Sequence, residues 1–118
     1  MKEFTITRVY SDEHGDSHFQ DITVPLTSAG PIGYLSEKIA VKELIFRKVK
    51  PGYDYEFHTA PTRQYIILLD VGIEIETSLG VKRQFKPGHV LQVEDVTGKG
   101  HRSRNLEAKE RQSIFVTY

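Results

Sequence analysis

The sequence predicts an all-β fold, a sandwich or barrel of short antiparallel strands. Apolar and polar residues alternate with a period of two along most of the chain, which is typical of strands with one buried face. Turns rich in glycine and proline separate these segments at regular intervals. No segment has the apolar spacing of an amphipathic helix, so about ten strands are expected to build the core.

The first half of the chain is expected to contain three strands. Alternation is clear in FTITRVY and again in SHFQDITV, with a polar, glycine-containing turn between them. The segment VKELIFRKV fits either a helix or a strand. A strand is favoured because its apolar residues run up to the breaker Pro51–Gly52. The expected strands are residues 4–10, 17–24 and 41–49.

Period-two alternation dominates the second half of the chain. The aromatic residues of YDYEFH alternate with Asp54, Glu56 and His58. Residues 64–71 are apolar on both faces, and such a strand is expected to be covered on both faces. The expected strands are residues 53–58, 64–71, 73–77, 81–85, 90–93 and 112–118.

Length, composition and charge restrict the class of protein. The 118 residues suit one domain, 1–118, and the absence of cysteine excludes disulfides and thiolate metal sites. The 16 basic and 16 acidic residues give no net charge, so no nucleic-acid partner is expected. There is no apolar run long enough to span a membrane and no signal-type segment at the start of the sequence. A cytoplasmic protein without a membrane partner is therefore expected.

Two histidine-containing motifs have a characteristic spacing. In the first, about residues 52–72, five residues separate Gly52 from His58, and Gly72 closes the motif one residue late. In the second, about residues 80–105, His101 follows Gly98 and precedes Asn105 at the expected distances. This order resembles the two motifs of the cupin superfamily, and the resemblance covers roughly half the chain. It implies a cupin-type double-stranded β-helix, or jelly-roll barrel, with a pocket between its sheets.

The resemblance also implies a metal site of three histidines and one glutamate, from which this sequence departs. Ala60 stands at the second histidine position and Gln64 at the glutamate position. Any metal ion would be held by His58, Gln64 and His101, which is a poor set of ligands for a transition metal. A divalent metal is therefore less expected than a metal-free pocket.

His58 and His101 are the candidate catalytic residues, because two imidazoles in one pocket can exchange protons near neutral pH. Some cupin epimerases and ketoisomerases work in this way, so a metal-independent isomerase or epimerase-like enzyme of unknown small-molecule ligand is the leading hypothesis. A metal-dependent dioxygenase or isomerase and a non-catalytic ligand sensor remain open. The alternative without a function is that His58, Gln64 and His101 only satisfy one another's hydrogen bonds in a semi-buried cavity.

Further ligand-binding candidates are Gln64, Asp95, Lys99 and Arg63. Lys99 opens a cationic run without acids, which would favour an anion, although a solvated turn with surface ion pairs is the favoured interpretation. If His101 points inward, alternation turns Ser103 and Asn105 inward and the intervening arginines outward.

A homodimer is expected from residues 64–71. If Gln64 faces the pocket with Ile66 and Leu68, then Tyr65, Ile67 and Leu69 face outward. An exposed apolar stripe of this length is a solubility hazard, which a second copy of the chain would cover.

Overall fold

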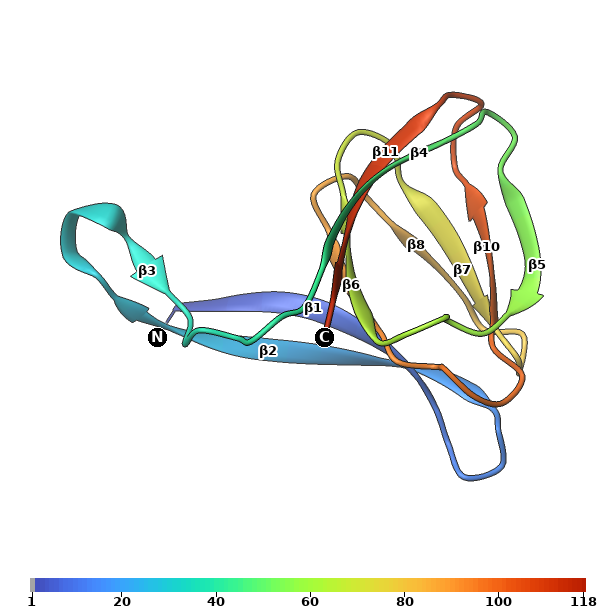
Figure 1. The fold of residues 1–118 in the computed structure, drawn as a ribbon, viewed down its shortest axis with the longest axis horizontal. Coiled ribbons are helices and arrows are strands. Elements are labelled where there is room, and N and C mark those ends of the chain that lie inside the picture. The colour runs from blue at the N-terminus through green and yellow to red at the C-terminus, as the bar shows by residue number, and fades with distance from the viewer. Residues whose placement is uncertain (1) are drawn as a thin grey trace.

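The computed structural model describes residues 2–118, which form an all-β architecture of two sheets (Figure 1). The larger sheet has the order β3-β2-β1-β9-β6-β11-β4 and the smaller sheet the order β5-β10-β7-β8. The strands are β1 (Lys2–Ser11), β2 (Ser17–Ser28), β3 (Tyr34–Leu35), β4 (Leu44–Val49), β5 (Asp54–His58), β6 (Gln64–Leu68), β7 (Ile73–Thr77), β8 (Lys82–Phe85), β9 (Val90–Val93), β10 (His101–Asn105) and β11 (Arg111–Thr117).

The only helical element among residues 2–118 is a single 3-10 turn, Gly30–Ile32. None of the described residues form a helix that is long and apolar enough to cross a membrane. Strand pairing within residues 2–118 yields two separate sheets, and no hydrogen-bonded strand pair joins them into a closed barrel.

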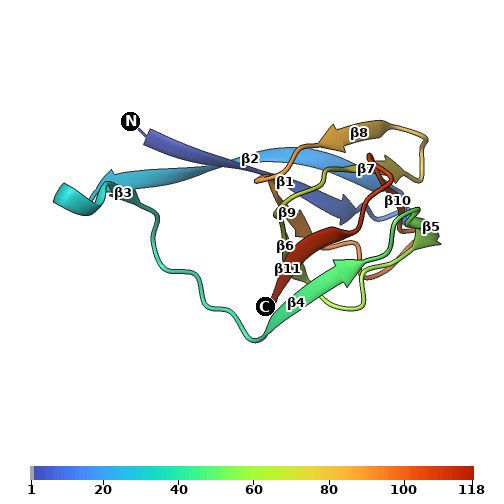
Figure 2. The same cartoon turned by 90° about the horizontal axis from the view of Figure 1, so that it is seen from above.

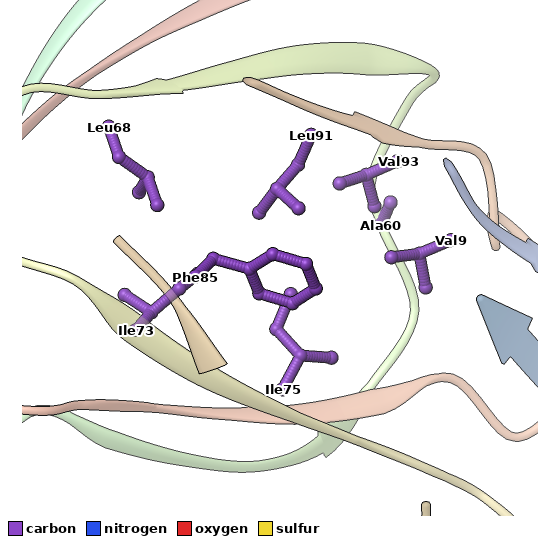
Figure 3. Packing of buried hydrophobic residues seen from close by; sticks show 8 residues of the cluster. All are labelled: Val9, Ala60, Leu68, Ile73, Ile75, Phe85, Leu91 and Val93. Atoms are coloured by element: carbon purple, nitrogen blue, oxygen red, sulfur yellow. The ribbon is translucent and has the colours of Figure 1, made fainter. Parts of the chain in front are cut away.

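The hydrophobic core lies between the two sheets (Figure 3). Inward-facing residues of β1, β6 and β9 pack against those of β7 and β8, and Ala60 reaches the core from the loop after β5. This is the expected result of period-two alternation, because each strand buries one face. The core residues are Val9, Ala60, Leu68, Ile73, Ile75, Phe85, Leu91 and Val93.

Most of the expected strands are confirmed, including a strand within residues 41–49, where a helix was the alternative. β3 and β10 were not predicted as separate strands. In β10, His101, Ser103 and Asn105 are buried while Arg102 and Arg104 lie at the surface, as alternation predicts. The strand expected over residues 64–71 ends earlier, at Leu68.

The alternation read from YDYEFH is wrong at its end, because β5 contains a β-bulge. His101 pairs with His58, but Ser103 pairs with Tyr55, so two steps along β10 match three steps along β5. The extra residue in β5 reverses the alternation. His58 therefore lies on the same face as Tyr55, and their rings stack with centroids 3.9 Å apart.

The N-terminal hairpin extends beyond the sandwich. β1 and β2 pair over their full length, from Lys2–Leu26 to Ser11–Ser17, and only the half near Ser11 packs on the core. The other half, with β3, forms a projecting arm (residues 2–5 and 23–35) that both views show extending beyond the remaining strands (Figures 1 and 2). Phe4, Tyr34 and Leu35 are exposed on this arm.

Candidate ligand cavity

A cavity of about 330 Å³ lies between the sheets, next to the hydrophobic core. Its walls come from β4, β6, β9 and β11 of the larger sheet and from β5, β7 and β10 of the smaller one. Apolar side chains such as Ile66, Ile75 and Val93 form much of the surface. The volume is at the lower end of the range usual for small-molecule sites, and a mainly apolar wall with a few polar groups is typical of them.

His101 lines this cavity at the start of β10, and Asp95 fixes its orientation. His101 is 5% exposed, and its Nδ1–H donates to Asp95 Oδ2 over 2.5 Å. Asp95 is fully buried, and its other oxygen, Oδ1, has no hydrogen-bond partner among residues 2–118. Because the carboxylate holds Nδ1, Nε2 is the ring nitrogen available to a bound molecule.

His58 reaches the same cavity from the end of β5, where the bulge turns it inward. Its Nδ1–H donates to the carbonyl oxygen of Glu56 over 2.7 Å, so the neutral ring carries its lone pair on Nε2. Burial lowers the pKa of His58 below the ordinary value of 6.5, and the nearby charges of His101 and Arg47 act in the same direction. His58 is therefore neutral at physiological pH and can accept a proton at Nε2.

The rings of His58 and His101 are close neighbours, with centroids 4.7 Å apart. The loop before β10 makes this approach feasible because it passes directly over the end of β5. Gly100 has a φ of 74°, and a Cβ on it would lie 2.1 Å from the carbonyl oxygen of His58. Only glycine satisfies both the backbone conformation and the close contact.

The other candidates from the sequence lie in different places. Gln64 is buried and lines the cavity, while Asp95 lies behind His101 and is not part of the lining. Lys99 and Arg63 are exposed outside the cavity, and Lys99 Nζ pairs with Asp16 Oδ1 over 2.9 Å. The structure thus brings together His58, Gln64 and His101, with Asp95 as a supporting residue.

Sequence reasoning missed two arginines of the cavity, Arg47 on β4 and Arg111 on β11. Arg111 is 1% exposed, and its Nε donates to Asn105 Oδ1 over 2.7 Å. Burial lowers the pKa of Arg111 to about 10, so the side chain still carries its charge at neutral pH. For Arg47 the sequence did contain a usable pattern. Arg47 lies two residues before Val49 in the same strand, so both side chains are on one face, and Val49 faces the interior.

Aromatic side chains flank both guanidinium groups. The Arg47 and Arg111 groups lie 5.2 and 5.3 Å from the ring centroid of Tyr53, and Arg47 also lies 4.9 Å from that of Phe115. The Tyr53 hydroxyl shares a hydrogen bond with Ser103 Oγ over 3.1 Å. These contacts hold the cations against aromatic faces, where the interaction is favourable.

The residues of this cavity do not fit the metal site that the cupin resemblance implies. Within residues 2–118 no three histidine, aspartate or glutamate side chains are grouped as metal ligands. Two imidazoles and the Gln64 amide supply no anionic ligand, and two guanidinium groups in the same cavity oppose a cation electrostatically.

No protein-family model matches the sequence, and a comparison with curated proteins found no match.

Proposed function

We propose that the protein binds a small molecule in the cavity between its sheets and that it is a cupin-type jelly roll adapted to work without a metal ion. Support for the cupin assignment comes from the spacing of Gly52, His58, Gly98 and His101 in the sequence and from the meeting of both histidines in one cavity. The observation that carries the functional proposal is the pair of imidazoles, 4.7 Å apart, on that cavity's wall.

The two rings are suited to different halves of a proton transfer. His58 is neutral, and its Nε2 can accept a proton from a bound molecule. His101 can return a proton from its own Nε2, because the Asp95 carboxylate at Nδ1 balances the charge of the protonated ring. Movement of a proton between neighbouring atoms of one molecule is the chemistry of isomerases and epimerases.

A screen of small molecules by nuclear magnetic resonance tests the binding proposal. The ring nitrogens of His58 and His101 should respond together to the compounds that bind, while those of the exposed His14 should not. The replacements His58→Ala and His101→Ala should leave the fold intact and remove these responses. Compounds that perturb only surface residues would contradict the proposal.

Proton transfer requires a separate measurement. A bound enolisable ketone or aldose should exchange its α-hydrogen with deuterium oxide faster than it does without protein. Exchange should fall in His58→Gln and in Asp95→Asn, with binding retained in both variants. Full exchange in both variants would refute the roles of His58 and Asp95 in proton transfer, and a wild-type protein that does not accelerate exchange would leave a binding protein, or sensor, as the function.

A second copy of the chain is the proposed partner. A row of apolar residues crosses four strands on the outer face of the larger sheet, and by strand register it consists of Phe46, Ile114, Ile67 and Val90. The projecting arm is a two-stranded hairpin with exposed apolar residues, and such a hairpin is marginally stable in water by itself. In a twofold dimer the arm of each copy can cover the outer row of the other copy, so that both apolar surfaces are buried.

A further inference from the structure

Six of the seven arginines of this protein fall into two groups, and the seventh, Arg63, is exposed to solvent outside the cavity. Four at the surface have carboxylate partners: Arg8 pairs with Glu94, Arg83 with Asp21, Arg102 with Asp54 and Arg104 with Glu74. Arg47 and Arg111 have no carboxylate within ion-pair distance among residues 2–118, although they are the two arginines that line the cavity. A buried charge without a counter-ion is costly, so the two cavity arginines need a different explanation.

Arg111 presents the clearest need for a partner. It is 1% exposed, its Nε is held by Asn105, and its Nη1 has no hydrogen-bond partner among the described residues. Asn105 is a neutral group that orients the guanidinium without compensating its charge. A donor that is buried, oriented and unsatisfied is arranged to meet an acceptor supplied from outside the chain.

Arg47 adds a second positive charge beside the first. In the register of β4 and β11, Arg47 pairs with Ser113 and Val49 pairs with Arg111, so the two arginines are diagonal neighbours on one face. Both guanidinium groups also lie against the ring of Tyr53, at 5.2 and 5.3 Å from its centroid, so their positive charges are close enough to repel each other. An anion between them would replace this repulsion with two attractions.

The charges of the other lining residues favour an anion over a cation. The lining contains both guanidinium groups and both imidazoles but no aspartate or glutamate. Apolar residues on the walls, such as Ile66, Ile73 and Phe115, suit a hydrocarbon body.

We propose that the ligand of this cavity is a small organic carboxylate, bound through its carboxylate group by Arg111 and Arg47, with its other end against His58 and His101. This inference rests on the proposed function, because it names the chemical class of the molecule that the same cavity holds. A carboxylate matches the planar guanidinium fork, and it is easier to desolvate than a phosphate dianion in so apolar a space.

Calorimetric titration with three aromatic probes tests the assignment. Benzoate and benzamide have nearly the same shape and differ in charge, and phenyl phosphate offers the other common oxyanion. Benzoate should bind at least about tenfold more tightly than benzamide and more tightly than phenyl phosphate. The inference is overturned if benzoate fails to bind at millimolar concentrations, if benzamide binds as tightly, or if phenyl phosphate binds more tightly.

Variants of adjacent residues supply the control. Arg47→Gln removes a charge from the cavity face of β4, and Lys48→Gln removes the same charge from the exposed face of that strand. Arg47→Gln and Arg111→Met should each weaken benzoate binding about tenfold or more and leave benzamide binding unchanged, whereas Lys48→Gln should have no effect. Should Arg111→Met fail to fold, the half-buried Arg47 still decides the question.

The outcomes for this inference and for the proposed function can be told apart. Neutral compounds that shift the ring signals of His58 and His101, together with a lack of preference for benzoate, would keep the cavity as a binding site and refute its anion specificity. Equal benzoate affinity in wild-type protein, Arg47→Gln and Arg111→Met would refute the two arginines as its binding group.

Discussion

Single hydrogen bonds give the two cavity histidines different roles. A backbone carbonyl holds Nδ1 of His58, and a buried carboxylate holds Nδ1 of His101. In both rings Nε2 is thereby left for a bound molecule. The two partners differ in charge, because the carbonyl oxygen at His58 is neutral and the carboxylate at His101 is an anion.

The buried position of His58 should make the stability of the protein depend on pH. Its pKa is lowered in the folded state, so the unfolded chain binds a proton more readily than the folded one near the ordinary value of 6.5. The free energy of unfolding should therefore fall as the pH is lowered from about 7.5 to about 5.5. Denaturant unfolding at a series of pH values measures this slope.

Two histidine variants separate the contribution of His58 from that of the other histidines. His58→Gln should flatten the slope, and the remainder should come partly from His89, whose pKa is also lowered by burial. His14→Gln, at a side chain that is 78% exposed, should leave the slope unchanged. An identical slope in wild-type protein and His58→Gln would contradict the account of this residue.

At the scale of strands and loops, two irregularities form the site. The bulge in β5 turns His58 toward Tyr55 and the cavity, and the loop before β10 brings Gly100 against the backbone of His58. Bulges are common beside functional sites because they redirect a side chain without ending the strand.

Substitution of Gly100 should be far more damaging than its positive φ alone explains. Gly100→Ala should lower the free energy of unfolding by about 3 kcal/mol or more, because the new methyl group meets the His58 carbonyl. Gly80→Ala supplies the control, since Gly80 has a φ of 83° and open space around it, and should cost about 1 kcal/mol. Chemical denaturation of both variants measures the difference. Equal losses of unfolding free energy in Gly100→Ala and Gly80→Ala would mean that the close contact between Gly100 and the His58 carbonyl does not contribute to stability.

These irregularities also mark the limits of prediction from the sequence. Alternation correctly turned His101, Ser103 and Asn105 inward, because β10 pairs regularly with β7. Alternation failed at His58, because a β-bulge cannot be recognised from the order of polar and apolar residues. The motif spacing, and not the alternation, predicted that His58 faces the pocket, and His58 lines the cavity.

The cavity arginines illustrate a different limit. Sequence reasoning named Lys99 and Arg63 as cationic candidates for ligand binding, and the structure places both at the surface outside the cavity. The cations that line the cavity are Arg111 and Arg47, because β11 and β4 lie at the end of the larger sheet beside it. Strand order is a property of long-range pairing, and local patterns do not contain it.

At the scale of the whole molecule, the structure leaves two apolar surfaces without cover from residues 2–118. One is the projecting arm, and the other is the outer row of the larger sheet. Phe46 lies in this row and is 77% exposed, so its replacement removes no contact of the core. A substitution of Phe46 should therefore change the association of two chains and not the folding of one chain.

The proposed dimer predicts that Phe46→Asp produces a folded monomer. A charge buried in an apolar interface is strongly unfavourable, whereas the same charge on a free surface costs little. Leu79→Asp, at an exposed leucine in the turn after β7, should leave the dimer intact. Sedimentation velocity distinguishes the two forms. A wild-type protein that sediments as a monomer would refute the dimer directly.

A crystal structure of the protein soaked with a small molecule that the resonance screen selects tests the central claim most directly. The account predicts density for the molecule inside the cavity, within hydrogen-bond distance of Nε2 of both His58 and His101. A structure in which the molecule occupies only the outer surface, while the cavity holds water or is closed by its own side chains, would contradict that claim.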